Sequence, residues 1–274
     1  MLNWIKRNSL ITYFIIAYAV SWSFEIPLAL LKQGMISWSI PMWLHYFAAL
    51  GPFMAALTMT FLTEGRSGLR DLITRIFKWR LPVRYYAFVI LIPVGLFTFA
   101  CGLNRLLTGT WPDLKLLGAV DYLPYLTPLG GLGLWIITFG LGEETGWRGY
   151  ALPHLQKTRS ATAATLILGI LWAGWHLPGF FYRDTYMQMG VMGFPMLALS
   201  LVFAAMIFTW LYNSTGGSLW IVILFHAVFN WLTANEAGGP FGAAILSVAV
   251  ILWALSIPRR YGMENAAPLA RQVA

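Results

Sequence analysis

The chain has 274 residues, of which 59% are hydrophobic and only 10% are charged. Because an ordinary soluble domain carries about 25% charged residues, this composition excludes a soluble globular protein. The formal net charge is +8 and there is one cysteine, which excludes a disulfide framework and a thiolate metal cluster. The polar stretches are too short to fold alone, so we expect one integral membrane domain over residues 1–274.

Apolar runs long enough to cross a bilayer recur along the whole chain. The first follows Lys6 and Arg7 without a small-residue cleavage site behind it, which predicts a retained membrane anchor. Gly, Pro and charged residues divide the chain into about eight such runs. We expect helices near 10–31, 43–62, 86–107, 125–142, 161–181, 192–212, 217–233 and 240–257. The predicted fold is therefore an all-α, polytopic bundle of transmembrane helices.

The distribution of Lys and Arg predicts the orientation of this bundle. If the N-terminus is cytoplasmic, only Lys32, Arg105, Lys115 and Arg183 among the 18 basic residues fall on the other side of the membrane. Cytoplasmic loops are enriched in Lys and Arg, so we expect both termini to be cytoplasmic. We expect the short polar tail after Arg260 to be flexible.

The stretch over about 64–84 predicts an amphipathic helix at the membrane surface. Its apolar residues Leu69, Leu72, Ile73 and Ile76 recur at helical spacing, with basic residues on the other faces. A basic amphipathic helix beside anionic headgroups explains most of the net charge without nucleic acid as a partner. The alternative is a docking site for a soluble part of a substrate.

Ionisable residues inside the bilayer are costly and are functional candidates by default. Glu143 and Glu144 lie at the cytoplasmic end of the fourth predicted span. On a helix Glu144 pairs with Arg148 four residues later, whereas Glu143 points about 100° away from that pair. A carboxylate without a cationic partner in apolar surroundings can take and give a proton. Glu143 is therefore our candidate general base.

Two further spans carry polar side chains at helical spacing. Trp172 and His176 share a face of the fifth span, and His226 and Asn230 share a face of the seventh. Stacked donors such as His226 and Asn230 could stabilise an oxyanion. Either histidine taken singly could instead be an interhelical hydrogen-bonding strut, but the cost of burying the whole set argues against a purely structural role. Glu25 is expected at the outer membrane interface, with a position facing the cavity as the alternative, and His45 is expected in a solvated or interfacial position.

In these residues the sequence resembles the CAAX-protease and bacteriocin-processing family of intramembrane glutamic endopeptidases, also called the CPBP or ABI family. That family's pattern is Glu-Glu-x-x-x-Arg, then an aromatic residue four before a histidine, then His-x-x-x-Asn or Asp. Here it falls on Glu143, Glu144 and Arg148, then on Trp172 and His176, then on His226 and Asn230. The motif-bearing core is about 140–231. Two features differ from the family's eukaryotic prenyl-protein branch: Trp172 stands where phenylalanine is common before the histidine, and the segments around the motifs resemble the bacterial branch.

The resemblance implies an enzyme that hydrolyses a peptide bond of a membrane-associated protein or peptide. The catalytic set would be Glu143, Glu144, His176, His226 and Asn230, with Arg148 and Trp172 as structural support. Water would lie between Glu143 and His176, and His226 and Asn230 would stabilise the oxyanion. The expected location is a bacterial cytoplasmic membrane, with the lipid bilayer and the substrate as the partners.

Glu143, His176 and His226 are also residue types that bind zinc, and two histidines with a carboxylate form a known catalytic set. However, the sequence has no His-Glu-x-x-His segment, and the family is usually taken to use glutamate without a bound metal. We therefore expect no cofactor, and zinc at these three residues is the alternative.

Two other classes of function remain open. Glu and His relays also mark the paths of proton-coupled transporters, but the two similar halves with broken helices that many transporters contain are not evident in this sequence. A non-catalytic membrane protein that binds a partner, for example one conferring immunity to a peptide toxin, would not need every motif residue. The sequence therefore favours an intramembrane peptidase.

Overall fold

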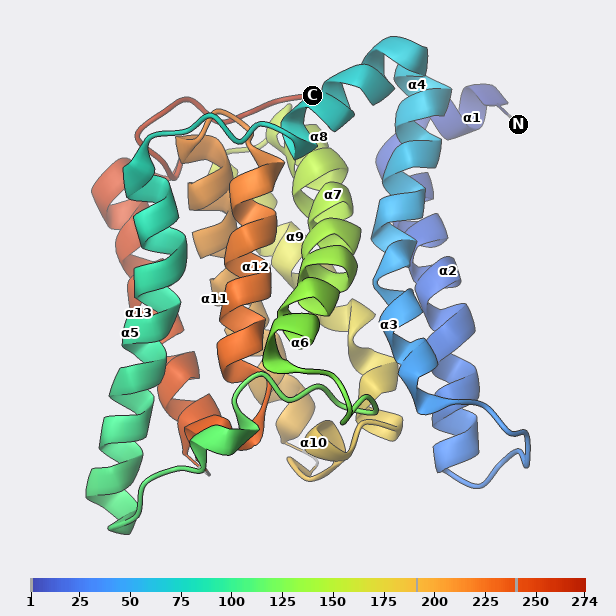
Figure 1. The fold of residues 1–274 in the computed structure, drawn as a ribbon. Coiled ribbons are helices and arrows are strands. Elements are labelled where there is room, and N and C mark those ends of the chain that lie inside the picture. Colours follow the sequence, from blue (N-terminus) through green and yellow to red (C-terminus); the bar gives the residue numbers. More distant parts are fainter. Residues whose placement is uncertain (1, 191, 240) are drawn as a thin grey trace.

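The computed structural model describes residues 2–190, 192–239 and 241–274 as a bundle of helices, with no β-strand among those residues (Figure 1). The helices are α1 (Leu2–Arg7), α2 (Ser9–Lys32), α3 (His45–Ala48), α4 (Leu50–Ile76), α5 (Val83–Thr108), α6 (Pro128–Trp135), α7 (Glu144–Gly146), α8 (Leu152–Gln156), α9 (Ala161–Trp175), α10 (Asp184–Met187), α11 (Gly193–Ser214), α12 (Leu219–Thr233) and α13 (Gly242–Tyr261). The predicted all-α class is confirmed. Residue 240, the expected start of the last span, lies outside the described residues.

Six helical stretches in the described part of the chain are long and apolar enough to cross a membrane. They are Ser9–Lys32, Met42–Ile76, Val83–Thr108, Ala161–Phe181, Gly193–Ser214 and Gly242–Tyr261. The protein is therefore an integral, multi-pass membrane protein. The other two predicted spans are also helical: α12 is a shorter apolar helix, and the predicted fourth span lies in the helix that begins at Pro128. The total number of spans and their orientation stay predictions.

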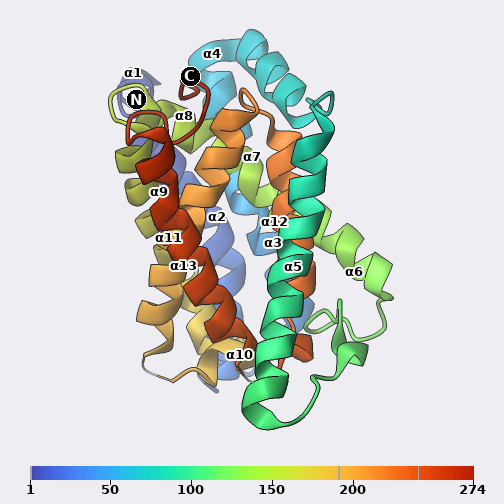
Figure 2. The same cartoon turned by 90° about the vertical axis from the view of Figure 1, so that its left-hand side faces the viewer.

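Both chain ends lie at one end of the bundle, near the C-terminal part of α4 (Figure 1). We call it the basic end, because Arg66, Arg75, Lys78, Arg80 and Arg84 lie in the stretch of chain that passes over it. Figure 2 shows α13 on the outside of the bundle, where it packs against α11 and α5. The end that carries the excess positive charge is thus also the end that carries both termini.

Gly65 forms a kink within α4. Its φ angle is 69°, in the left-handed region that favours glycine, and the rest of α4 turns away over the basic end (Figure 1). Leu72 in this segment is fully buried. The surface helix predicted over 64–84 is too long: it ends at Ile76, and residues 77–82 connect it to α5. Pro82 disfavours helix at the residue before it.

The helix that carries the two glutamates is longer than the predicted 125–142. It runs without a break from Pro128 to Gln156, through two π-helical segments, Ile136–Glu143 and Trp147–Ala151. We call it the motif helix. It continues past Glu143 because Glu144 and Arg148 pair across one turn. The helix does not end at the glutamates, as predicted: they lie near its middle, where π-helical turns often mark functional sites.

Close approach between the motif helix and α4 requires glycine at two positions. A Cβ atom on Gly146 would lie 2.4 Å from Cβ of Pro52, and one on Gly142 would lie 2.6 Å from the carbonyl oxygen of Ala49. Both distances are far below van der Waals contact. The two glycines therefore let α4 pack directly against the segment that bears Glu143 and Glu144.

The C-terminal tail is not flexible, as the sequence had suggested, but packs against the basic end. Ala266 is fully buried. The Gln156 side chain donates to the Gln272 carbonyl at 2.6 Å, and the Asn213 side chain donates to the Asn265 carbonyl at 3.0 Å. Buried amide side chains need partners, and the tail supplies them to the ends of α8 and α11.

Candidate functional site

Glu144 joins the motif helix to α12. Nη1 of Arg148 lies 3.0 Å from each carboxylate oxygen of Glu144, and both side chains are fully buried. On the other side, Nδ1 of His226 lies 2.7 Å from Oε1 of Glu144. The expected Glu144–Arg148 pair therefore forms. Because a carboxylate accepts, His226 carries a hydrogen on Nδ1.

Glu143 faces away from that pair, toward two tryptophans. Its Oε2 atom accepts a hydrogen bond from Nε1 of Trp172 at 2.6 Å and another from Nε1 of Trp147 at 3.2 Å. The sequence predicted no partner for this carboxylate, and the structure gives it two neutral ones. Its second oxygen, Oε1, accepts no hydrogen bond from the described residues. Glu143 is thus held by one oxygen only.

Trp172 also orients His176, which lies one turn further along at the end of α9. Nδ1 of His176 lies 2.7 Å from the Trp172 carbonyl oxygen, and a carbonyl only accepts, so Nδ1 carries the hydrogen. The neutral ring then has its lone pair on Nε2, which makes no hydrogen bond to the described residues. Pro178 ends the α-helix just after this position. Trp172 therefore fixes both Glu143 and His176.

Two aromatic rings enclose the Arg148 guanidinium. Its central carbon lies 4.7 Å from the ring centre of Trp172 and 4.4 Å from that of Phe208. Nε and Nη2 of Arg148 are buried and have no hydrogen-bond partner among the described residues. Cation–π attraction is strongest where water is excluded, so the rings offset part of the cost of burying this charge.

The structure brings most of the predicted site residues together. Direct contacts join Glu143, Glu144, Arg148, Trp172, His176 and His226 through hydrogen bonds and ring packing. Asn230 is partly buried one turn beyond His226 on α12, and its side chain makes no hydrogen bond to the described residues. It lies next to the site only through the spacing of that helix.

The contacts of Glu143, His176 and His226 show whether these side chains are placed to bind a metal ion. The part of the chain that the structure describes has no group of three His, Cys, Asp or Glu side chains placed to hold a metal ion. Instead, Nδ1 of each histidine and Oε2 of Glu143 are engaged with protein partners. In this conformation Glu143, His176 and His226 do not converge as a ligand set.

Two features of the site were not predicted from the sequence. Trp147 was not singled out, although its position four residues after Glu143 places both on one helix face. A second polar cluster lies toward the end opposite the basic end. There the Tyr182 hydroxyl donates to Oε1 of Glu25 at 3.1 Å and lies 3.0 Å from Nδ1 of His45.

Glu25 and His45 are buried inside the protein and not exposed at the favoured interfacial or solvated positions. Only 4% of the surface of Glu25 and 3% of that of His45 is exposed. Tyr182, from the segment after α9, contacts both side chains. No local pattern in the sequence predicts this contact, because the three residues come from separate parts of the chain.

Residues 125–232 match the family described as type II CAAX prenyl endopeptidase Rce1-like. The chain is also similar to a protein of Methanococcus maripaludis named CAAX prenyl protease 2, with 24% identity over 223 residues, which cover 80% of this chain and 81% of that relative. The family match includes all the motif residues, from Glu143 to Asn230. Through this stretch, which is less than half of the chain, the sequence is similar to the Rce1-like family of CAAX prenyl endopeptidases.

Proposed function

We propose that the protein is an intramembrane endopeptidase that hydrolyses a peptide bond of a membrane-associated protein or peptide, with Glu143 as the general base. The observation that carries this proposal is the position of Trp172 between two reactive groups. Its indole N–H donates to Glu143 and its carbonyl accepts from His176. Oε1 of Glu143 and Nε2 of His176 are thereby left available to a water molecule.

Glu143 takes a proton from that water as the water oxygen attacks the peptide carbonyl carbon. Oε2 is occupied by two indole N–H groups, so the proton goes to Oε1. His176 accepts the second hydrogen of the water at Nε2 and orients it. When the C–N bond breaks, the proton on Glu143 passes to the leaving amine, so that one carboxylate acts first as base and then as acid.

Attack on the carbonyl makes an oxyanion, which His226 and Asn230 stabilise from α12. His226 already donates from Nδ1 to Glu144, so it can donate to the oxyanion only from a protonated Nε2. Glu144 balances the resulting charge on the ring. The Asn230 side-chain amide supplies the second donor. Such donors are most effective in a site from which water is largely excluded.

Glu144 and Arg148 act through other residues. Glu144 fixes the ring of His226, and Arg148 fixes Glu144. Both charges are fully buried. Removing Glu144 would leave the Arg148 charge without a carboxylate partner, and removing Arg148 would leave Glu144 with His226 alone, in a medium of low dielectric constant. We therefore assign them to positioning His226 rather than to proton transfer.

The names of the matching family and of the relative suggest which substrate to test first. Both names refer to the CAAX prenyl motif, so a membrane-anchored peptide with a C-terminal Cys-aliphatic-aliphatic-x sequence is the first substrate to examine. The depth of the site in a membrane protein requires a substrate that reaches the bilayer. We expect the enzyme to act in a bacterial cytoplasmic membrane.

The test is a cleavage assay with the purified full-length protein in lipid vesicles. The substrates are lipid-anchored peptides that end in this motif, with and without a farnesyl group on the cysteine. Glu143→Gln keeps an oxygen for the two indoles but cannot take a proton, so we expect cleavage to fall by about a hundredfold or more. Glu64→Gln, at an exposed glutamate on α4, is the matched control and should cleave like the unaltered protein.

Product analysis by mass spectrometry identifies the bond that is cut and the form of the peptide that is preferred. Cleavage by the Glu143→Gln protein at the rate of the unaltered protein would contradict the role of Glu143. Folding of each variant is checked by its helical circular dichroism and by its elution from size-exclusion chromatography.

A further inference from the structure

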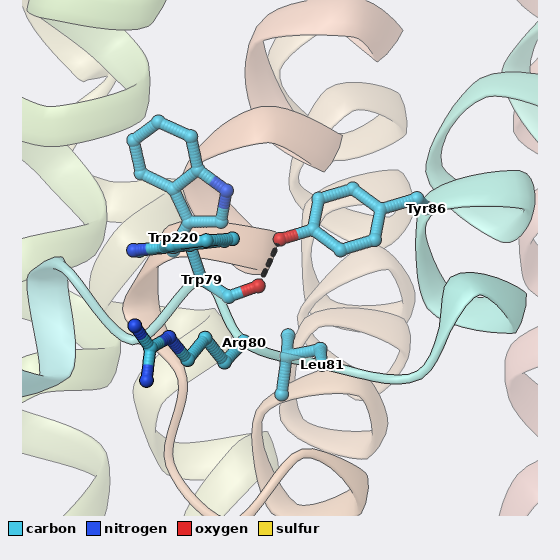
Figure 3. A pocket seen from close by; sticks show the side chains of 5 residues that line it. All are labelled: Trp79, Arg80, Leu81, Tyr86 and Trp220. Atoms are coloured by element: carbon cyan, nitrogen blue, oxygen red, sulfur yellow. Dashed lines mark hydrogen bonds between the residues drawn. The ribbon is translucent and has the colours of Figure 1, made fainter.

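A pocket at the basic end lies outside the proposed catalytic site. It has a volume of about 430 Å³ and is lined by Trp79, Arg80, Leu81, Tyr86 and Trp220. The first three residues belong to the connection between α4 and α5, and the other two begin α5 and α12. Figure 3 shows the Tyr86 hydroxyl pointing at the Trp79 carbonyl, to which it donates a hydrogen bond. This hydrogen bond holds the connection between α4 and α5 against the first turn of α5.

The pocket combines an apolar lining with unneutralised positive charge. Its three aromatic rings and one leucine resemble the belts of Trp and Tyr found at headgroup depth. Residues 75–84 contain Arg75, Lys78, Arg80 and Arg84 but no acidic residue. Arg75 pairs with an acidic residue of its own helix and Lys78 donates to the Gly216 carbonyl.

The two remaining arginines in this stretch are available to a ligand. Arg80 and Arg84 make no hydrogen bond to the described residues. Their guanidinium groups lie over the rings of Trp79 and Tyr85, at 5.4 and 5.1 Å. A planar guanidinium binds phosphate oxygens through several N–H donors at once, so Arg80, which lines the pocket, suits a phosphate group.

We propose that this pocket binds an anionic phospholipid. The phosphate pairs with Arg80, and the glycerol with the upper part of an acyl chain lies against Trp79, Trp220 and Tyr86. A zwitterionic phospholipid also has a phosphate, but its headgroup cation would lie near Arg80, which forms no ion pair with a carboxylate of the described residues. Charge therefore selects an anionic lipid such as phosphatidylglycerol.

The pocket wall is connected to the helix that carries His226 and Asn230. The Ser218 hydroxyl, at the N-cap of α12, donates to the Lys78 carbonyl at 2.8 Å, and Lys78 Nζ donates to the Gly216 carbonyl at 2.7 Å. Trp220 follows in the first turn of α12. A lipid that contacts Trp79 and Trp220 together therefore stabilises the start of α12 against the connection. Lipid binding should raise the temperature at which the protein unfolds.

The experiment is native mass spectrometry of the full-length protein, titrated with phosphatidylglycerol or with phosphatidylcholine of the same acyl chains. We expect tighter binding of phosphatidylglycerol, and a loss of about fivefold in that affinity in Arg80→Gln, the effect expected for one arginine beside an anionic lipid. Arg260→Gln is the matched control, because Arg260 is also exposed at the basic end and also lies 5.4 Å from the ring of the neighbouring Tyr261.

A specific site requires that Arg80→Gln weakens binding and Arg260→Gln does not. An equal loss in both variants would mean that the lipid responds only to overall charge and would overturn the proposal, as would equal affinity for the two lipids. Thermal unfolding gives a second readout: phosphatidylglycerol should stabilise the unaltered protein and Arg260→Gln more than it stabilises Arg80→Gln. Neither measurement depends on peptidase activity, so this inference and the proposed function can fail separately.

Discussion

Replacement of Trp172 by phenylalanine removes one hydrogen-bond donor from Glu143 and leaves the ring and the backbone in place. The carbonyl that accepts from His176 is retained, as is ring packing against Arg148 and His226. The substitution therefore isolates the 2.6 Å bond between the indole and the carboxylate. If that bond positions the general base, its loss should slow the chemical step.

The size of the effect follows from the geometry. A hydrogen bond to a charged group contributes about 1.5–3 kcal/mol. Trp147 still donates to the same oxygen at 3.2 Å, so the lower value applies. About 1.5 kcal/mol in the barrier corresponds to roughly a tenfold fall in kcat. KM should stay nearly constant, because Trp172 is assigned to positioning Glu143 and not to binding the substrate.

Trp175→Phe is the matched control for the cleavage assay. Trp175 lies on the same helix and its ring packs against His176, but its Nε1 atom is buried without a hydrogen-bond partner in the described structure. Its replacement therefore removes an N–H that orients nothing, and kcat should change little. Equal effects of the two substitutions on kcat would refute the role assigned to the Trp172 indole.

Further predictions concern stability, metal and topology. Arg148→Met leaves Glu144 buried without its cation, so the free energy of unfolding in detergent should fall by about 3–5 kcal/mol; adding Glu144→Gln should restore part of this loss. Protein stripped of metal by a chelator should keep its peptidase activity, and inactivation that zinc reverses would instead favour Glu143, His176 and His226 as zinc ligands, in a conformation that brings them together. A reporter fused after Gly262 should be cytoplasmic, and an extracytoplasmic signal would overturn the predicted orientation.

Local spacing was enough to predict the parts of the structure that lie within one helix. The contact between Glu144 and Arg148 follows from their separation of four residues, and hydropathy located the long helices. The motif helix was underestimated because its glycines resemble the signals that end helices. In the structure, Gly142 and Gly146 instead permit close packing against α4.

Contacts between helices could not be predicted from the sequence. The bond from Trp172 to Glu143 depends on how α9 packs against the motif helix, and burial of Glu25 depends on a tyrosine 157 residues away. The C-terminal tail looked flexible because it is polar, yet amides on α8 and α11 bind its backbone. In each case the partner is distant in the sequence, so composition and periodicity carry no signal for it.

The central claim is that Glu143 activates the water that cuts a peptide bond, and protein termini in cells test it most directly. Mass spectrometry would compare the termini of membrane proteins in cells expressing either the unaltered protein or Glu143→Gln at equal levels. We predict new termini only with the unaltered protein, and these would also identify a natural substrate. Identical termini in the two strains, with both proteins folded and inserted, would contradict the claim and favour a binding or transport function.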